Sequence, residues 1–278
     1  MRPRWIRIAR RQRVRDLAAA LACTLLVGAC AAPAERADHA ARAFGYERLV
    51  LPGARFLHVA YFKRGAPDAV LHVYVEHDGV PWITPAQPAA DPTPRRLLML
   101  ELMAQDPAPA LYLGRPCYFG LAQVPPCEAV WWTHRRYSAE VVDSMAAALT
   151  GFLTTNRNIT AVEIFGFSGG GAIAALLAAR IPSTRRLVTV AAPLDLDEWT
   201  RAHDYTPLSG SQSPLRQPPL SPSIRQLHLA GAEDRVVGSA VIRPFVATQP
   251  TAEFRELPGF DHVCCWDSVW ASVVLGAQ

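Results

Sequence analysis

The chain has 278 residues, of which 50% are hydrophobic and 19% charged, and this composition allows one large buried core. The formal net charge of +4 does not indicate nucleic-acid binding, because seven arginines lie within residues 1–15 and the rest of the chain is close to neutral. The composition therefore excludes a protein that binds a phosphate backbone through a basic stripe.

Residues 1–29 have the pattern of a secretory signal peptide. The arginine-rich start is followed by an apolar run over residues 17–29, which is too short to span a bilayer as a helix. The run ends on Val27-Gly28-Ala29-Cys30, which resembles a bacterial lipobox. That resemblance implies cleavage before Cys30 and lipidation of its thiol. Ordinary signal cleavage at another small residue is the alternative.

A lipidated Cys30 would attach the protein to a membrane. Residues 30–43 would then form a lipidated tether, and the folded domain is expected over residues 44–278. Ala31 after the cysteine, rather than an aspartate, favours the outer membrane of a Gram-negative cell. We therefore expect a protein of the bacterial cell envelope, lipid-anchored at the periplasmic face of the outer membrane.

Predicted strands and helices alternate from residue 55 onward. The first two apolar runs are predicted strands joined by a turn, and the lack of a helix between them indicates an antiparallel start to the sheet. The predicted strands cover residues 55–62, 69–76, 110–114, 160–167, 186–193, 223–231 and 252–259. The predicted helices cover residues 94–105, 138–156, 169–180, 238–249 and 263–276. This alternation predicts an α/β fold with a mostly parallel central sheet and helices on both faces.

Four cysteines lie in the predicted folded domain. Cys117 and Cys127 flank a proline-containing loop and are predicted to form a disulfide in an oxidising compartment. Cys264 and Cys265 are adjacent, and either a vicinal disulfide or two free buried thiols would suit them. No metal-binding spacing of cysteines or histidines occurs, so no metal site is predicted.

The segment Gly166-Phe167-Ser168-Gly169-Gly170 matches the pattern G-x-S-x-G. A predicted strand precedes it and an alanine-rich predicted helix follows, which is the setting of a nucleophile elbow. The small residues let the backbone turn sharply, and the helix N-terminus favours negative charge near the serine. A phosphate-binding loop is the alternative, but no lysine follows in the P-loop pattern.

These residues, with an aspartate and a histidine following in the order Ser…Asp…His, resemble the α/β-hydrolase family of serine esterases, lipases and related acyl hydrolases. The resemblance extends from about residue 56 to residue 270. It implies a catalytic triad of Ser168, Asp234 and His262 without a metal or organic cofactor. Asp195 and Asp197, which follow the preceding predicted strand, are alternative positions for the acid.

The resemblance also implies two backbone N–H donors for an oxyanion, those of Gly169 and Asp78, with Gly79 as the alternative to Asp78. The loop that carries the second donor reads Glu76-His77-Asp78-Gly79, which looks like the E-x-D-G variant of secreted bacterial relatives rather than the common His-Gly-Gly type. An aspartate side chain there would disfavour an anionic substrate unless it is turned away or capped. Further candidates for the substrate pocket are His77, Arg115, Trp199, His203 and Tyr205.

Together these features predict a serine hydrolase that cleaves ester or thioester bonds of small to medium acyl substrates. The polar segment over residues 195–223 is too short for a large lipase lid, which argues against bulk-lipid hydrolysis. A peptidase of the same fold is one alternative. A non-catalytic envelope lipoprotein that uses the hydrolase scaffold for binding is the other.

Overall fold

The computed structural model describes residues 32–65 and 68–276. The predicted signal peptide and Cys30 lie outside the described residues. Within the described ranges, no helix combines the length and the apolar character needed to cross a membrane.

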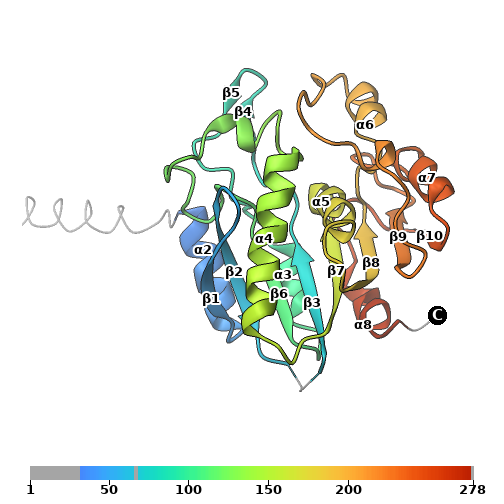
Figure 1. Cartoon of the computed structure of the whole chain (residues 1–278). Helices are drawn as coiled ribbons and strands as arrows, with labels where there is room; N and C mark the ends of the chain where they lie inside the picture. Colours follow the sequence, from blue (N-terminus) through green and yellow to red (C-terminus); the bar gives the residue numbers. More distant parts are fainter. Residues whose placement is uncertain (1–31, 66–67, 277–278) are drawn as a thin grey trace, which may run out of the picture.

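A sheet of eight strands forms the centre of the molecule (Figure 1). The strand order is β1-β2-β6-β3-β7-β8-β9-β10; β2 pairs antiparallel with β1 and with β6, and every later pair is parallel. The strands are β1 (Glu47–Pro52), β2 (Leu57–Lys63), β3 (Val70–Val75), β6 (Ala110–Leu113), β7 (Ala161–Phe167), β8 (Thr184–Val190), β9 (Arg225–Gly231) and β10 (Ala252–Leu257). The predicted α/β class with a mostly parallel sheet is confirmed.

The predicted pairing at the start of the sheet differs from the structure. The strands β2 and β3 run in opposite directions but are not neighbours, because β6 lies between them: Tyr112 of β6 pairs with Tyr61 on one side and with Tyr74 on the other. The antiparallel start is instead the β1–β2 pair. The strand β1 was not predicted, because its first two residues are charged and none of its residues is fully buried.

Helices cover both faces of the sheet. The helices α4 (Ala139–Thr155) and α5 (Gly169–Ala178) run in front of it in Figure 1, and α7 (Ser239–Thr248) packs on the same face of β9. The opposite face is covered by α2 (Pro33–Ala43), α3 (Leu98–Met103) and α8 (Asp267–Leu275). Because successive strand residues point to opposite faces, Gly166 of β7 meets α5 while its neighbour Phe165 packs edge-to-face against Trp270 of α8, with ring centroids 5.6 Å apart.

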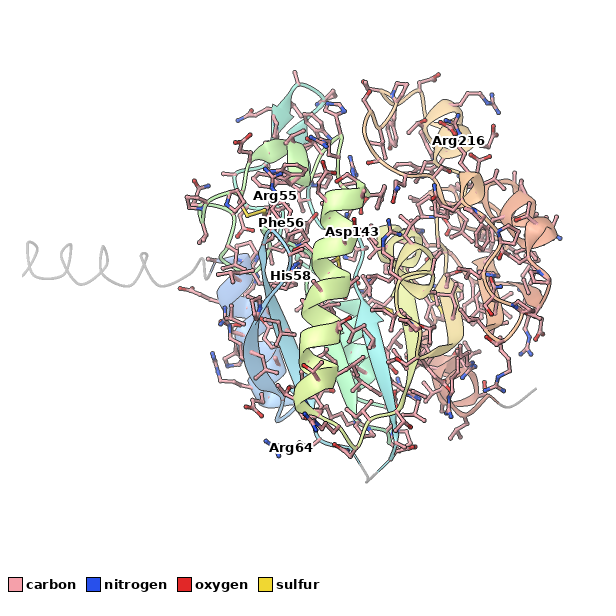
Figure 2. All side chains as sticks on the ribbon, in the orientation of Figure 1. Arg55, Phe56, His58, Arg64, Asp143 and Arg216 are labelled. Carbon is pink, nitrogen blue, oxygen red and sulfur yellow. A yellow bond between two sulfur atoms is a disulfide. The ribbon has the colours of Figure 1, made fainter. Side chains whose placement is uncertain are left out.

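Side chains fill the spaces between the sheet and the helices, and Phe56 and His58 lie beside α4 (Figure 2). The loop after β6 is closed by a disulfide between Cys117 and Cys127, whose Cα atoms are 5.5 Å apart. Cys264 and Cys265 are bonded to each other, so the structure contains the vicinal disulfide rather than two free thiols.

Residues 33–43, which the sequence predicts as part of a tether, form the helix α2 and pack on the domain. Ala37 and Ala41 lie one turn apart and are buried. Asp38 on the same helix accepts hydrogen bonds from Tyr61 Oη at 2.6 Å and from Arg48 Nε at 2.9 Å. The small alanine side chains let the helix approach the sheet closely, and the folded domain therefore includes residue 33 onward.

Candidate active site

The predicted site residues lie at the carboxyl ends of the parallel strands, where α/β proteins place their ligand sites. Ser168 directly follows β7, and Asp78 follows β3. Asp234 follows β9, and His262 lies in the loop between β10 and α8. Strands that are far apart in the sequence thus bring these four residues together along the carboxyl ends of the strands.

Ser168 occupies a sharp turn between β7 and α5. Its backbone has φ 53° and ψ −128°, a conformation that costs energy for a residue other than glycine. Glycines make the turn possible: a Cβ at Gly166 would collide with the backbone of Gly170, and a Cβ at Gly170 would collide with the carbonyl oxygen of Val75. The strand and the helix therefore pass so closely that larger side chains cannot fit, which explains the G-x-S-x-G pattern.

Ser168, His262 and Asp234 form a continuous chain of hydrogen bonds. Ser168 Oγ lies 3.1 Å from His262 Nε2, and His262 Nδ1 lies 2.8 Å from Asp234 Oδ2. The other carboxylate oxygen of Asp234 accepts the backbone N–H groups of Val236 and Val237 at 2.7 and 2.8 Å. The Asp234 side chain is fully buried while His262 is 17% exposed, so the acid is fixed and the base is open to the cavity.

The other nearby carboxylates have different partners. Asp195 Oδ1 caps α6 (Leu196–Ala202) by accepting two backbone N–H groups at its start, each at 3.2 Å. Asp197 forms an exposed ion pair, and Asp261 Oδ1 accepts two backbone N–H groups of its own loop. Asp234 is therefore the carboxylate that bonds His262, and Asp195 and Asp197 serve the helix and its surroundings.

Two histidines border the serine, and only one of them faces its hydroxyl. The ring of His262 packs against Phe167 with centroids 5.0 Å apart, and His77 contacts the same phenyl ring at 5.7 Å. His77 Nδ1 accepts the backbone N–H of Gly79 at 3.0 Å, so Nε2 carries the proton that it donates to the carbonyl oxygen of Arg96. Burial lowers the pKa of His77, and the neutral ring holds the loop that leads to Asp78.

The residues of the two predicted oxyanion donors, Gly169 and Asp78, are in close contact. Gly169 is the first residue of α5, so its backbone N–H has no acceptor within the helix. A Cβ at Gly169 would collide with Asp78 Oδ1, which shows how closely Asp78 approaches the start of the helix. The carbonyl oxygen of Asp78 accepts a hydrogen bond from Tyr118 Oη at 2.8 Å, and this bond helps to orient the peptide group.

The Asp78 side chain is capped by Arg115, a predicted pocket residue, and by Arg136 and Tyr137, which the sequence analysis did not identify as functional. Its carboxylate forms ion pairs with Arg115 and with Arg136 (Nη1 to Oδ2, 2.9 Å), and it accepts a hydrogen bond from Tyr137 Oη. Burial alone would raise the pKa of this carboxyl, but the two arginines and the tyrosine outweigh burial and hold the pKa well below its usual range. The carboxylate is thus ionised, and the two arginines balance its negative charge. That charge therefore does not exclude an anionic substrate.

A cavity of about 710 Å³ opens on Ser168 and His262. One wall is the small hairpin of β4 (Trp82–Thr84) and β5 (Gln87–Pro88), and the other wall extends from α6 to residue 208. The remaining lining residues combine aromatic, apolar and polar side chains: His77, Asp78, Gly79, Pro81, Trp82, Ile83, Thr84, Pro85, His134, Arg136, Trp199, Thr200, His203, Asp204, Tyr205, Thr206 and Leu208.

Four of the five predicted pocket residues line this cavity; Arg115 does not, and pairs with Asp78 instead. Trp199, His203 and Tyr205 form an aromatic cluster, in which the His203 and Tyr205 rings are stacked with centroids 5.2 Å apart. Trp199 Nε1 and His203 Nε2 both donate hydrogen bonds to the backbone carbonyl oxygen of Val236, at 3.0 and 2.8 Å. The cluster therefore both packs the loop and shapes the cavity.

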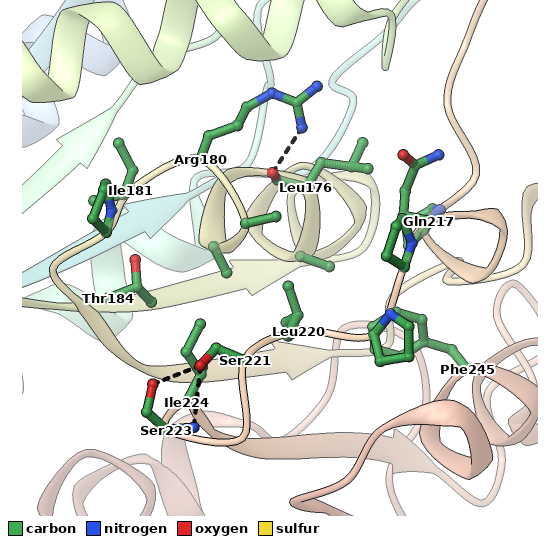
Figure 3. Close-up of a pocket in the computed structure, with 17 residues that line it drawn as sticks. Leu176, Arg180, Ile181, Thr184, Gln217, Leu220, Ser221, Ser223, Ile224 and Phe245 are labelled. Atoms are coloured by element: carbon green, nitrogen blue, oxygen red, sulfur yellow. Dashed lines mark hydrogen bonds between the residues drawn. The ribbon is translucent and has the colours of Figure 1, made fainter.

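A second cavity, of about 320 Å³, lies between the end of α5 and the proline-rich segment over residues 217–224 (Figure 3). Its lining is largely apolar. Arg180 Nη1 donates to the carbonyl oxygen of Leu176 at 3.0 Å, and the hydroxyls of Ser221 and Ser223 bond each other at 2.8 Å. None of the triad residues borders it, so the chemistry is expected at the larger cavity.

Comparison with known proteins places the fold. No protein-family model and no curated protein matches the sequence. An α/β serine hydrolase homologue from Coxiella burnetii superposes with a TM-score of 0.54 and 15% identity, covering 82% of this chain and 94% of that one. An esterase from Pyrococcus furiosus superposes with a TM-score of 0.60 and 12% identity, covering 84% of this chain and 91% of that one. A puromycin-hydrolyzing peptidase from Mycobacterium tuberculosis superposes with a TM-score of 0.59 and 14% identity, covering 82% of this chain but 37% of that one.

These structures superpose over more than four fifths of this chain, with TM-scores above 0.5. The chain therefore has the α/β-hydrolase fold, as the resemblance in its sequence implied. At these identities the comparison establishes the fold, and the activity has to be argued from the site itself.

Proposed function

We propose that this protein is a serine hydrolase that cleaves ester or thioester bonds of small to medium acyl substrates through an acyl-enzyme. The single observation that supports the proposal most strongly is the hydrogen-bonded chain from Ser168 through His262 to the buried Asp234, at the mouth of a cavity of about 710 Å³. A histidine that contacts a serine hydroxyl on one side and a fixed carboxylate on the other is the arrangement that makes such a hydroxyl nucleophilic.

Each residue has a defined part in the proposed reaction. Asp234 accepts the Nδ1 proton of His262, so Nε2 is free to take the proton of Ser168 as its Oγ attacks the substrate carbonyl. The N–H groups of Gly169 and Asp78 bind the oxyanion of the tetrahedral intermediate. His262 then returns the proton to the leaving group, the acyl-enzyme remains on Ser168, and a water molecule activated by His262 releases the acid.

The cavity suits an acyl group of limited size. The hairpin of β4 and β5 and the aromatic cluster close it on two sides, and indole, phenol and aliphatic side chains supply apolar contacts for an acyl chain. Trp82 and Ile83 of the hairpin face the same cavity as Trp199, Tyr205 and Leu208. We therefore expect short acyl chains to be preferred over long ones.

Turnover of p-nitrophenyl esters, from acetate to laurate, tests this proposal. Ser168→Ala should abolish turnover and labelling by a fluorophosphonate probe, while the matched control Ser272→Ala, at an exposed position on α8, should leave both unchanged. Labelling without ester turnover, together with cleavage of aminoacyl amides, would favour a peptidase. A folded wild-type protein that neither reacts with the probe nor cleaves either bond would instead be a binding module.

We also propose that the protein is attached to the cell envelope by lipid on Cys30. The lipobox-like segment Val27-Gly28-Ala29-Cys30 at the end of the apolar run supports this location. Fractionation of cells that express the full chain should find the wild type with the membranes and Cys30→Ser in the soluble fraction. Membrane association that is unchanged in Cys30→Ser would contradict the anchor and leave the hydrolase proposal untouched.

A further inference from the structure

The charged cluster around Asp78 lies deep in the protein beside the predicted oxyanion site. The side chains of Arg115, Arg136 and Asp78 are only 3%, 6% and 15% exposed. Ion pairs that are this buried contribute little net stability, because the loss of hydration offsets most of the attraction between the charges. Their position therefore suggests a role in the site rather than in holding the fold together.

Each arginine is fixed by bonds on more than one side. Arg115 Nη2 donates to the carbonyl oxygen of Arg136 at 2.7 Å, and its guanidinium lies over the Tyr137 ring, 5.2 Å from the centroid. Arg136 Nε donates to the carbonyl oxygen of Thr133 at 2.7 Å, while its Nη1 bonds Asp78. The two guanidinium groups are thus rigid supports for one carboxylate.

That carboxylate connects the two oxyanion donors. It belongs to Asp78, whose own backbone N–H is one donor, and it lies against Gly169, whose N–H is the other. A Cβ at Gly169 would collide with both the Asp78 carboxylate and the hydroxyl of Tyr137. A displacement of the Asp78 side chain would therefore move one N–H group relative to the other.

The cluster also carries charge. Two arginines against one carboxylate leave a net positive charge beside the place where the oxyanion would form. The nearest further carboxyl on this loop, Glu76, accepts the backbone N–H groups of Met99 and His77, and burial raises its pKa to about 8, so it is mostly neutral at pH 7 and does not cancel that charge. In a buried site with a low effective dielectric constant, such a charge stabilises a developing anion more than it would in water.

We propose that Arg115, Arg136 and Tyr137 are positioning residues, which hold Asp78 against Gly169 so that both N–H donors point at the oxyanion and which place a net positive charge beside it. The proposal rests on the proposed hydrolase function. It extends that function to three residues from the loop after β6 and the segment before α4, none of which the Ser-His-Asp arrangement by itself would require.

The test uses full-length protein and separates kcat from KM. Removing the Tyr137 hydroxyl in Tyr137→Phe should lower kcat about tenfold, and removing a charge in Arg136→Gln should lower it by about 10- to 100-fold, each with KM changed less than about threefold. Arg136→Lys keeps the charge and should recover most of the activity that Arg136→Gln loses. The affinity of a trifluoromethyl ketone, which forms a tetrahedral adduct with the serine, should fall in parallel with kcat/KM.

Matched controls come from the same sheet. Tyr112 is a buried tyrosine whose hydroxyl has no hydrogen-bond partner among the described residues, and Arg186 is a buried arginine that pairs with Glu163 on a neighbouring strand. Tyr112→Phe and Arg186→Gln should leave kcat unchanged, even if the melting temperature falls. These controls separate the expected loss of kcat in Tyr137→Phe and Arg136→Gln from a loss of activity caused by unfolding.

The inference is overturned if Tyr137→Phe and Arg136→Gln keep the wild-type kcat. It is also overturned if Arg136→Lys loses as much kcat as Arg136→Gln while the ketone binds the wild type and the variants equally tightly. The proposed function fails separately, through a wild-type protein that does not react at Ser168. A wild type that is active and labelled, with variants that are equally active, rejects the positioning role alone.

Discussion

His58 on β2 and Ser144 on α4 meet in the core, where His58 Nε2 lies 2.9 Å from Ser144 Oγ. The other ring nitrogen, Nδ1, lies 3.0 Å from the carbonyl oxygen of Gly114, to which it can only donate. His58 therefore carries its proton on Nδ1 and is neutral, and its ring joins the antiparallel start of the sheet to α4. Both side chains are completely buried.

This burial predicts a loss of stability in acid. Burial lowers the pKa of His58 from 6.5 to about 4, so between these values the unfolded chain binds more protons than the folded one. The free energy of unfolding should thus fall as the pH drops from 6.5 towards 4, by about 2–3 kcal/mol for His58. Urea unfolding across this range measures the slope, and His58→Gln should reduce it. The exposed His39→Gln is the control; an equal slope in His58→Gln would contradict the assignment.

A glycine on the exposed side of α4 offers a gain in stability. Gly151 lies inside the helix, and a Cβ at this position would meet no atom within 4 Å. Alanine restricts the unfolded backbone more than glycine does, so Gly151→Ala should raise the free energy of unfolding by about 0.5–1 kcal/mol. Gly170→Ala should do the opposite, because its Cβ would collide with the backbone of β3. Thermal unfolding compares the two, and a lower melting temperature for Gly151→Ala would contradict the prediction.

The acid of the triad can be assigned by comparing two aspartates. Asp234→Asn removes the negative charge that orients and stabilises the His262 imidazolium, and it should lower kcat by about 10³–10⁴-fold. Asp195→Asn keeps a side chain that can cap α6, so its kcat should stay close to that of the wild type. Ester turnover measures both variants. Full activity in Asp234→Asn, or a comparable loss in Asp195→Asn, would contradict the assignment of Asp234.

The two disulfides should differ in their effect on stability. The bond between Cys117 and Cys127 closes a chain loop with a sequence separation of 10, so replacing both cysteines by serine should cost about 2–3 kcal/mol of unfolding free energy. The bond between Cys264 and Cys265 joins neighbours and closes no loop of this kind, so the same replacement there should cost much less. Urea unfolding of the two double variants checks the difference, and equal losses would contradict this explanation.

The first disulfide also supports the predicted oxyanion loop, because Tyr118 lies between its cysteines and donates its hydroxyl to the carbonyl oxygen of Asp78 at 2.8 Å. The Cys117→Ser/Cys127→Ser double variant should therefore lose ester turnover as well as stability. Measuring kcat well below the melting temperature separates the two effects. Unchanged kcat under those conditions would show that the loop keeps its shape without the bond.

The sequence alone predicted most of the strands and the sharp turn at Ser168, because each of them depends on the types of neighbouring residues in the chain. The apolar β-branched runs predicted the strands from β2 onward apart from the short β4–β5 hairpin, and the small residues around Ser168 predicted the sharp turn because only glycines fit where β7 and α5 pass closely. The helix α2 was missed because its apolar face consists of alanines, which resemble a linker in composition. The strand β1 was missed because it lies at the edge of the sheet and is largely exposed.

Tertiary structure decided how distant segments meet. The order of Ser168, Asp234 and His262 along the chain suggested the triad, but Ser168 and His262 are 94 positions apart, and their hydrogen bond depends on the packing of β7 and β10 in one sheet. No local pattern connects Asp78 with Arg136, 58 positions away. Their contact arises because β6 inserts beside β3 and brings its following loop to the same edge. The periodicity of short segments predicts which helix or strand a residue belongs to. The residue's neighbours depend on the pairing of the strands, and that pairing depends on burial of the whole core.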